Sequence, residues 1–203
     1  MSNAQITEKM KEKLKRKFGA LIIGDEILSG KRKDKHFEKL IFLLGKRGIE
    51  LSWTMYLPDD RDILTSVLMS TMKREDIVFS CGGIGATPDD HTRQCAASAT
   101  GVGLELHPEA KREIEQAFGK NAYPRRIEMG IFPAGCLIIP NPYNRIPGFT
   151  IKNHHFLPGF PVMAWPMIEW VLDTVYTDQH FLTDSISDSI TVSYTHLTLP
   201  TKA

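Results

Sequence analysis

Residues that could do chemistry are concentrated in one stretch, which runs from residue 76 to 92 and reads DIVFSCGGIGATPDDHT. A short apolar run in it predicts a buried strand, and Gly82, Gly83 and Gly85 follow that run. Glycines let the backbone N–H groups of such a turn point inward, and the start of the helix predicted after the turn adds partial positive charge. Together these features predict a cradle for an anion such as phosphate.

Two carboxylates, Asp89 and Asp90, stand at the same corner. A carboxylate beside a phosphate is repulsive unless a cation or a hydroxyl donor stands between them. The stretch therefore predicts a phosphorylated ligand with either Mg²⁺ or a polar group of the ribose or pterin type nearby. The alternative interpretation is an ordinary strand-to-helix turn in which one of the two aspartates caps the helix.

The elements that would position this stretch repeat a strand–helix pattern three times. Apolar runs at 18–23, 50–57 and 77–80 predict strands, and a helical pattern follows each of them. This alternation predicts a parallel sheet and an α/β fold. Ligands in such sheets bind beyond the carboxyl ends of the strands, where the loops GDEILSG, LPDD and GGIGATPDD lie. We therefore expect five acidic residues to converge near the glycine turn: Asp25, Glu26, Asp59, Asp89 and Asp90.

Further elements are predicted on either side of the glycine turn. The helix after LPDD places Ile63 on its inner face. Alternation over 148–157 predicts a C-terminal β-hairpin. In the last helix Pro161 suits a first helical position. Pro166 would break an interior turn, so we expect this helix to begin nearer residue 165 or to kink.

Length, composition and charge limit the class of protein. A chain of 203 residues with 42% hydrophobic and 24% charged residues is typical of one globular domain with a basic extension and a tail. A formal net charge of +1 gives no reason to expect a nucleic-acid partner. No apolar run approaches the roughly 20 residues that span a bilayer, so we expect no membrane partner. Three widely spaced cysteines without a CxxC pair predict a cytoplasmic location.

The expected domain boundaries follow changes in composition. Residues 1–17 carry six Lys and Arg against two Glu and form a basic N-terminal extension. Residues 18–176 hold all the predicted strands and helices and form the single domain. From residue 177 the sequence has no helical period, and we interpret 177–203 as a truncated or artefactual tail.

Three separated motifs then resemble one family. GGIGATPDDHT resembles the GGxGxxxxDxT pattern of the MoaB/Mog-type molybdopterin-binding domain. GDEILSG and PGFP are similar to motifs of the N-terminal domain of CinA-type competence/damage-inducible proteins. The resemblance implies a three-layer α/β/α sandwich with a mostly parallel sheet. It also implies a homo-oligomer, either a dimer or a trimer.

The resemblance also implies roles for particular residues. The family motif falls on Gly82, Gly83, Gly85, Asp90 and Thr92. The family aspartate after the second strand falls on Asp59, so that Asp59 and Asp90 are the implied catalytic residues and the implied ligands of Mg²⁺. The other two motifs add candidate ligand-binding residues: Gly24, Glu26, Ser29, Pro158 and Gly159.

Two functions are consistent with these motifs. The first is an enzyme, for which the resemblance implies either Mg²⁺-dependent hydrolysis of a nucleotide pyrophosphate such as ADP-ribose or a Mog-like adenylyl transfer. The second is a module that binds molybdopterin or a nucleotide without turning it over. Some roles stay open: Asp59 could instead cap the helix that follows it, and Arg145 could contact a ligand phosphate or be a solvated loop charge. The charged segment 31–36 replaces an Asn-rich turn of the CinA-type pattern.

Overall fold

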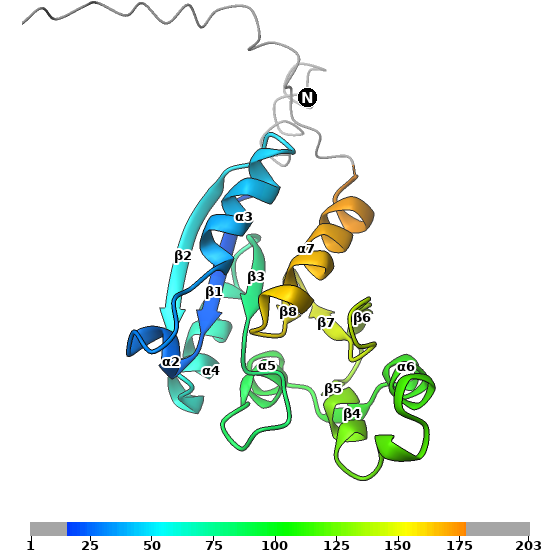
Figure 1. Ribbon diagram of the computed structural model, residues 1–203. Coiled ribbons are helices and arrows are strands. Elements are labelled where there is room, and N and C mark those ends of the chain that lie inside the picture. The colour runs from blue at the N-terminus through cyan, green and yellow to red at the C-terminus, as the bar shows by residue number, and fades with distance from the viewer. Residues whose placement is uncertain (1–15, 178–203) are drawn as a thin grey trace, which may run out of the picture.

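The computed structural model describes residues 16–177 (Figure 1), and the expectations for the N-terminal extension before residue 16 and for the tail from 178 lie outside these residues. The described chain contains helices, short 3₁₀ helices (η) and strands. In chain order they are β1 (Phe18–Ile23), α2 (Asp25–Leu28), α3 (His36–Gly45), β2 (Leu51–Leu57), α4 (Arg61–Thr71), β3 (Ile77–Cys81), α5 (Thr92–Thr100), β4 (Leu104–Leu106), α6 (Pro108–Phe118), η1 (Gly119–Ala122), η2 (Arg126–Gly130), β5 (Ile131–Pro133), β6 (Leu137–Ile139), β7 (Gly148–Ile151), β8 (His154–Leu157) and α7 (Pro161–Val175).

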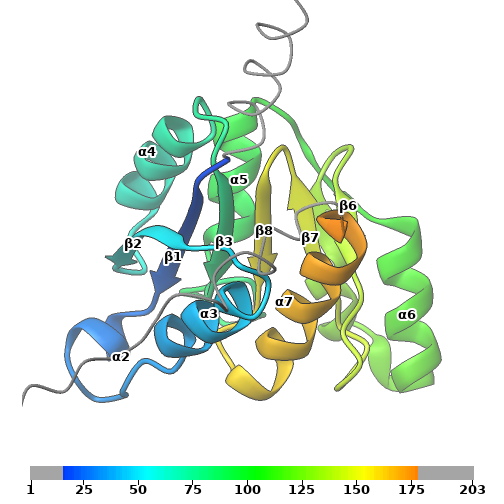
Figure 2. The same cartoon turned by 90° about the horizontal axis from the view of Figure 1, so that it is seen from above.

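The main sheet has six strands in the order β2-β1-β3-β8-β7-β6. The first four of these run parallel to one another, whereas β7 pairs antiparallel with both β8 and β6. Helices α3 and α7 cover one face of the sheet and α4 and α5 cover the other (Figure 2). The prediction of a three-layer α/β/α sandwich with a mostly parallel sheet and a C-terminal hairpin is therefore confirmed.

Alternation along the buried strands builds a hydrophobic core on each face of the sheet. In β1, Phe18 and Ala20 join the core under α3 and α7, whereas Leu21 and Ile23 join the core under α4 and α5. Successive side chains of a strand point to opposite faces, so a strand that is buried on both faces reads as one continuous apolar run. This is why the sequence FGALII marks the centre of the sheet.

Two local features differ from expectation. Helix α7 begins at Pro161, not nearer residue 165, and it contains Pro166 next to Met167 and Ile168, which are fully buried in the core. Packing of that stripe outweighs the one hydrogen bond that the missing N–H cannot make. Ile63 was predicted to face inward, yet 44% of it is exposed, because Leu64 and Leu68 point α4 at the sheet instead.

A small lobe accompanies the sandwich. Strands β4 and β5 pair antiparallel, with Glu105 opposite Phe132, and α6 lies beside them at the far end of the sheet from β2 (Figures 1 and 2). Phe132 is fully buried and links this lobe to the core under α4 and α5. Within residues 16–177 no helix is both long and apolar enough to cross a membrane. The three cysteines, Cys81, Cys95 and Cys136, are free and buried.

Candidate functional site

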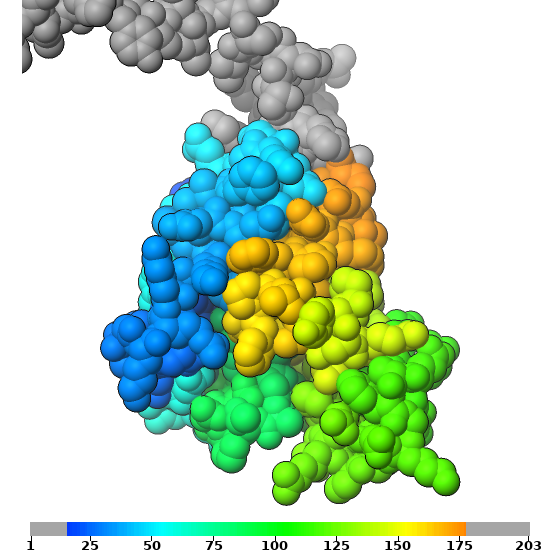
Figure 3. Space-filling model, viewed as in Figure 1, coloured from blue at the N-terminus to red at the C-terminus, as the bar shows by residue number. Residues whose placement is uncertain are grey.

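A cavity of about 570 Å³ lies at the carboxyl edge of the parallel strands. The loops after β1, β2 and β3 and the turn between β8 and α7 all contribute to its walls. Figure 3 shows the surfaces of these segments (blue, green and gold) lying next to one another on one face of the molecule. Of the predicted site residues, those that line the cavity are Gly24, Glu26, Asp59, Gly82, Gly83, Gly85, Asp90, Pro158 and Gly159. Asp89 lines it as well.

The glycine loop has a conformation that side chains would obstruct. Gly82 and Gly83 have φ angles of 116° and 69°, which L-residues with a Cβ rarely adopt. A Cβ on Gly82 would lie 2.3 Å from the carbonyl oxygen of Ile23. No hydrogen bond within residues 16–177 takes up the N–H groups of residues 83–86. These N–H groups therefore have no partner within the described chain, and the phosphate cradle expected from the sequence stays a prediction.

Two buried side chains hold the glycine loop in place. Thr92, which is fully buried, donates its hydroxyl to the carbonyl of Gly82 at 3.1 Å. Arg93 donates to the carbonyl of Gly85 at 2.6 Å and to the carbonyl of Glu128. Thr92 thus supports the loop from behind and does not line the cavity. Burial lowers the pKa of Arg93, and the charges of Asp90 and Glu128 oppose this shift.

Asp90 closes the glycine loop from the other side. Its Oδ2 accepts the backbone N–H of Thr87 at 2.8 Å and also the Thr87 hydroxyl. A Cβ on Gly85 would lie 2.6 Å from this same oxygen, so the glycine is needed for the carboxylate to sit against the loop. The N-cap position of α5 belongs to His91, whose side chain makes no capping bond. The capping interpretation of Asp90 is therefore wrong.

Asp59 joins the loop after β2 to the loop after β1. Its Oδ2 accepts the backbone N–H of Asp25 at 3.0 Å, and the N–H of Asp59 donates to Oδ1 of Asp25 at 3.3 Å. Asp60, not Asp59, caps α4, since its Oδ1 accepts the N–H groups of Asp62 and Ile63. The helix-cap alternative for Asp59 is therefore wrong.

The electrostatic surroundings of Asp59 are unfavourable to its charge. Partial burial raises the pKa of Asp59, and the negative charges of Asp25, Glu26 and Asp89 raise it further. The hydrogen bond from the Asp25 N–H lowers this pKa and offsets part of the effect. Negative charge gathered in this way raises the free energy of the ionised site, and a bound cation would lower it.

The loop after β1 contributes a further charged wall. Glu26 and Arg32 form an ion pair at 3.2 Å, and the Arg32 guanidinium lies 5.5 Å from the centre of the Phe160 ring. All three side chains line the cavity. Ser29 follows α2 on the exposed side of this loop and does not line the cavity.

The turn between β8 and α7 packs directly on the glycine loop. The N–H of Gly82 donates to the carbonyl of Leu157 at 2.9 Å. A Cβ on Gly159 would lie 3.4 Å from the Cα of Gly82. Because β8 is the parallel neighbour of β3, the PGFP motif reaches the same edge of the sheet as the glycine loop.

Sequence reasoning assigned no role to several residues that shape this site. Arg93 gave no signal, because its contacts depend on a tertiary approach to Glu128. Asn141 is buried and orders its loop by bonding Asn144, the Ile146 carbonyl and the Tyr143 N–H. Asn141 is followed by a proline, which is typical of a turn, but this local pattern does not show that Asn141 and Asn144 line the cavity.

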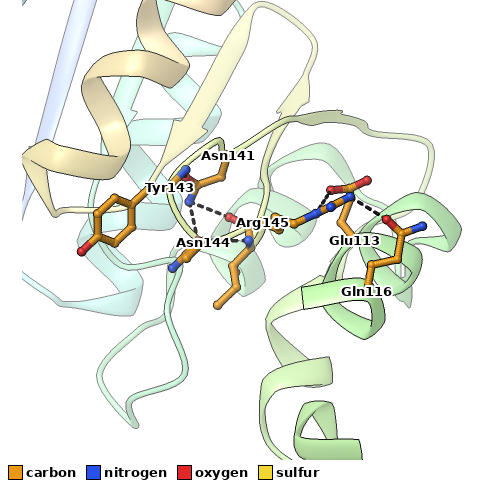
Figure 4. A network of polar contacts seen from close by, with 7 residues as sticks. Glu113, Gln116, Asn141, Tyr143, Asn144 and Arg145 are labelled. Carbon is orange, nitrogen blue, oxygen red and sulfur yellow. Dashed lines mark hydrogen bonds and ion pairs between the residues drawn. The ribbon is translucent and has the colours of Figure 1, made fainter. Parts of the chain in front are cut away.

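Arg145 lies apart from the cavity. Its guanidinium points toward α6 and bonds Glu113 at 2.8 Å and Gln116 at 2.6 Å (Figure 4). Arg145 also has a φ of 61°, which is uncommon for a residue with a side chain. Arg145 is thus an exposed loop charge, as one of the two interpretations from the sequence had it, and it also ties its loop to α6.

The two predicted ligands of Mg²⁺, Asp59 and Asp90, both line the cavity. Residues 16–177 contain no group of three or more His, Cys, Asp and Glu side chains that could hold a metal ion by themselves. Mg²⁺, however, is often bound by one or two carboxylates together with substrate phosphates and water. In Asp59 and Asp90 alike, hydrogen bonds within the described chain occupy Oδ2 and leave Oδ1 available.

Comparisons with known proteins bear on the family and the fold. Residues 19–177 match the family model described as "Probable molybdopterin binding domain". A CinA-like protein of Anaeromyxobacter dehalogenans (strain 2CP-C) is 36% identical over 163 residues, which cover 76% of this chain and 40% of that protein. A CinA-like protein of Citrifermentans bemidjiense is 35% identical over 156 residues, covering 73% and 38%. The chain thus spans about 40% of the length of these curated relatives.

Two solved structures share the fold. The protein CinA from Thermoplasma acidophilum superimposes with a TM-score of 0.70 at 24% identity, covering 81% of this chain and 99% of that one. The molybdopterin biosynthesis enzyme MoaB from Thermus thermophilus superimposes with a TM-score of 0.53 at 20% identity, covering 81% and 94%. At these identities the likeness concerns the fold alone.

Proposed function

Because the chain belongs to the molybdopterin-binding domain family, we propose that its cavity binds a phosphorylated pterin or nucleotide and hydrolyses a nucleotide pyrophosphate such as ADP-ribose. One observation carries the proposal: Asp59, Asp90 and the glycine-loop residues 83–86, whose N–H groups have no partner within the described chain, line the same cavity of about 570 Å³. A cavity of this size is within the range of small-ligand sites.

The chain's own groups account for binding and orientation. The N–H groups of residues 83–86 hold a phosphate, and the N-terminus of α5 adds partial positive charge beside it. Arg93 keeps the loop in this shape through the carbonyl of Gly85. In the hydrolysis, water adds across the P–O–P link of ADP-ribose and gives AMP and ribose 5-phosphate.

Asp59 and Asp90 would hold Mg²⁺ in this scheme. When bound, the ion supplies charge neutralisation to the phosphate oxygens. A site that bound phosphate through N–H groups alone would gain nothing from carboxylates at its rim, whereas a metal-dependent site needs them. Burial raises the pKa of Asp59 and the neighbouring carboxylates raise it further, and a bound cation would offset the repulsion from those carboxylates.

The second candidate is a binding module that holds molybdopterin or a nucleotide without turning it over. The same cavity and carboxylates would suit such a module, and the chain shares the fold of a molybdopterin biosynthesis enzyme.

We also infer a homo-oligomer, because large apolar side chains on α3 and β2 are exposed, among them Ile41, Phe42 and Tyr56. Three buried, free cysteines are consistent with a cytoplasmic protein.

Turnover of ADP-ribose by the full chain separates the two candidates. The products AMP and ribose 5-phosphate are measured by phosphate release in the presence of a phosphomonoesterase, with and without Mg²⁺. The hydrolase predicts release that requires Mg²⁺ and that Asp90→Asn abolishes while its melting temperature stays near that of the wild type. Tight binding of ADP-ribose or molybdopterin without any release would establish the binding module, and neither binding nor release would refute both.

A further inference from the structure

The candidate site contains an exposed aromatic side chain. Phe160 is 54% exposed, and within the described chain it is the only aromatic residue that lines the larger cavity, the one of about 570 Å³. It also lines a smaller cavity of about 260 Å³, which shares Glu26, Arg32 and Gly159 with the larger one. A single exposed apolar side chain needs no explanation on an open surface. Phe160, however, stands in the wall between two cavities.

The backbone holds Phe160 in a fixed position. Its carbonyl accepts the N–H groups of Met163 at 3.0 Å and Ala164 at 2.9 Å, in the first turn of α7. Pro161 follows, and a residue before proline favours an extended conformation, which the φ of −92° and ψ of 120° of Phe160 match. The side chain is thus carried on an ordered backbone, so a ligand that contacts it has little of the chain to order.

A guanidinium lies over the Phe160 ring. The Arg32 guanidinium is 5.5 Å from the centre of the ring, and Glu26 pairs with it at 3.2 Å. Aromatic rings and guanidinium planes both stack on flat heterocycles. Phe160 stays half exposed with Arg32 in this place, so part of its surface is open to a second flat group.

Phe160 also stands beside the glycine loop. It directly follows Gly159, and a Cβ on Gly159 would lie 3.4 Å from the Cα of Gly82. The N–H groups of residues 83–86 have no partner within the described chain. One cavity therefore presents an aromatic side chain next to a row of backbone donors. This pairing is complementary to a flat heterocycle that carries phosphate groups.

We propose that the heterocycle of the ligand stacks on the Phe160 ring while its phosphate groups occupy the glycine loop. The inference rests on the proposed binding of a phosphorylated pterin or nucleotide, and it adds the orientation of that ligand and a specificity-determining residue. Stacking requires a flat π-system and no particular hydrogen-bonding edge, so adenine and pterin both satisfy it. A phosphorylated sugar without a heterocycle does not.

The test measures affinities of the full chain by calorimetry in the presence of Mg²⁺. The ligands are α,β-methylene-ADP, whose bridge resists hydrolysis, and methylenediphosphonate, which has the same bridge but no heterocycle. Phe160→Leu keeps an apolar side chain and removes the aromatic face, whereas Phe160→Trp enlarges that face. We expect Phe160→Leu to bind α,β-methylene-ADP about tenfold more weakly than the wild type, and Phe160→Trp to bind it at least as tightly as the wild type. All three proteins should bind methylenediphosphonate equally.

Val162→Ala is the matched control. Val162 is 53% exposed, lies two residues after Phe160 and lines neither cavity, so this variant should keep every affinity of the wild type. A second arm of the test titrates 6-hydroxymethylpterin diphosphate. The heterocycle whose affinity falls in Phe160→Leu is the one that stacks on the ring.

Unchanged affinity of Phe160→Leu for both α,β-methylene-ADP and the pterin diphosphate would overturn the inference. So would an equal loss of affinity for methylenediphosphonate, because Phe160 would then only support the glycine loop. If the wild type bound none of these compounds, the proposed function itself would fail.

Discussion

Asp25 and Asp59 exchange hydrogen bonds across two loops: each backbone N–H donates to the other residue's carboxylate, at 3.0 Å and 3.3 Å. The residues are 34 positions apart in sequence and follow neighbouring parallel strands. These hydrogen bonds hold the carboxylate of Asp59 in place beside the cavity, and no positively charged side chain takes part in them. The arrangement also leaves several negative charges close together, which a ligand-bound cation would stabilise.

Asp59→Asn is predicted to stabilise the ligand-free protein at neutral pH. The pKa of Asp59 is raised in the folded state, so the folded protein binds this proton more tightly than the unfolded chain and loses stability as pH rises above the ordinary value of 3.8. Asparagine keeps an acceptor for the Asp25 N–H and removes the charge. Melting temperatures without divalent ions should favour the variant increasingly as pH rises from 3.8. A variant that melts below the wild type at neutral pH would contradict this prediction.

Gly85→Ala is predicted to impair binding more than folding. The new methyl would lie 2.6 Å from Oδ2 of Asp90, and Gly85 does not have a positive φ, so the carboxylate must move while the backbone need not. We expect at least a tenfold loss of ADP-ribose affinity and a loss of about 1–3 kcal/mol in stability, as for other overpacking changes. Gly103→Ala is the matched control, because nothing lies within 4 Å of its added Cβ. Equal affinities of the two variants would refute the role given to Asp90.

His154 is predicted to make the protein sensitive to acid. It is fully buried, its Nε2 lies 2.9 Å from the Thr71 hydroxyl, and burial lowers its pKa to about 4. Above pH 6.5, the ordinary pKa of histidine, His154 is neutral in both the folded and the unfolded protein. As pH falls from 6.5 toward 4, only the unfolded chain takes up the proton, so the free energy of unfolding decreases. The loss by pH 4 is on the order of 3 kcal/mol.

His154→Gln tests this assignment, because glutamine keeps a donor for Thr71 and does not titrate. Chemical denaturation between pH 7 and 4 should show a shallower decline for the variant than for the wild type. Parallel declines would show that other groups cause the acid sensitivity.

Arg145→Ala is predicted to leave ligand affinity unchanged. Its guanidinium is engaged by Glu113 and Gln116 on α6 and does not line the cavity (Figure 4). Calorimetric titration with ADP-ribose should give the wild-type dissociation constant, with at most a small drop in melting temperature. A tenfold weaker affinity would return Arg145 to the role of a phosphate ligand.

Topology explains why much of the site could be predicted from the sequence. The apolar runs of β1 and β3 are continuous because both faces of these strands are buried, and parallel strands bring the loops that hold Asp59 and Gly83 to one edge. The glycine loop could be predicted because its positive φ angles select glycine. These are local signals that a linear sequence carries.

Other features depend on contacts that no local pattern encodes. Arg93 supports the glycine loop by bonding Glu128, which is 35 residues away. The bond between Nε2 of His36 and the Gly159 carbonyl joins residues that are 123 positions apart in the chain. Strands β4 and β5 have three residues each and show no usable alternation. The start of α7 at Pro161 depends on burial of the helix, which outweighs the helix-breaking tendency of Pro166.

The central claim is that the cavity binds a pyrophosphate ligand through the glycine loop and a Mg²⁺ that Asp59 and Asp90 hold. The most direct measurement is calorimetric titration of ADP-ribose into the full chain, with and without Mg²⁺, for the wild type, Asp90→Asn and Asp62→Asn. Asp62 is the control, because it is exposed and does not line the cavity. The account predicts that Mg²⁺ strengthens the binding of ADP-ribose by the wild type and by Asp62→Asn. In Asp90→Asn the affinity should be at least tenfold weaker and should not depend on Mg²⁺. Equal, Mg²⁺-independent binding by all three proteins would contradict it.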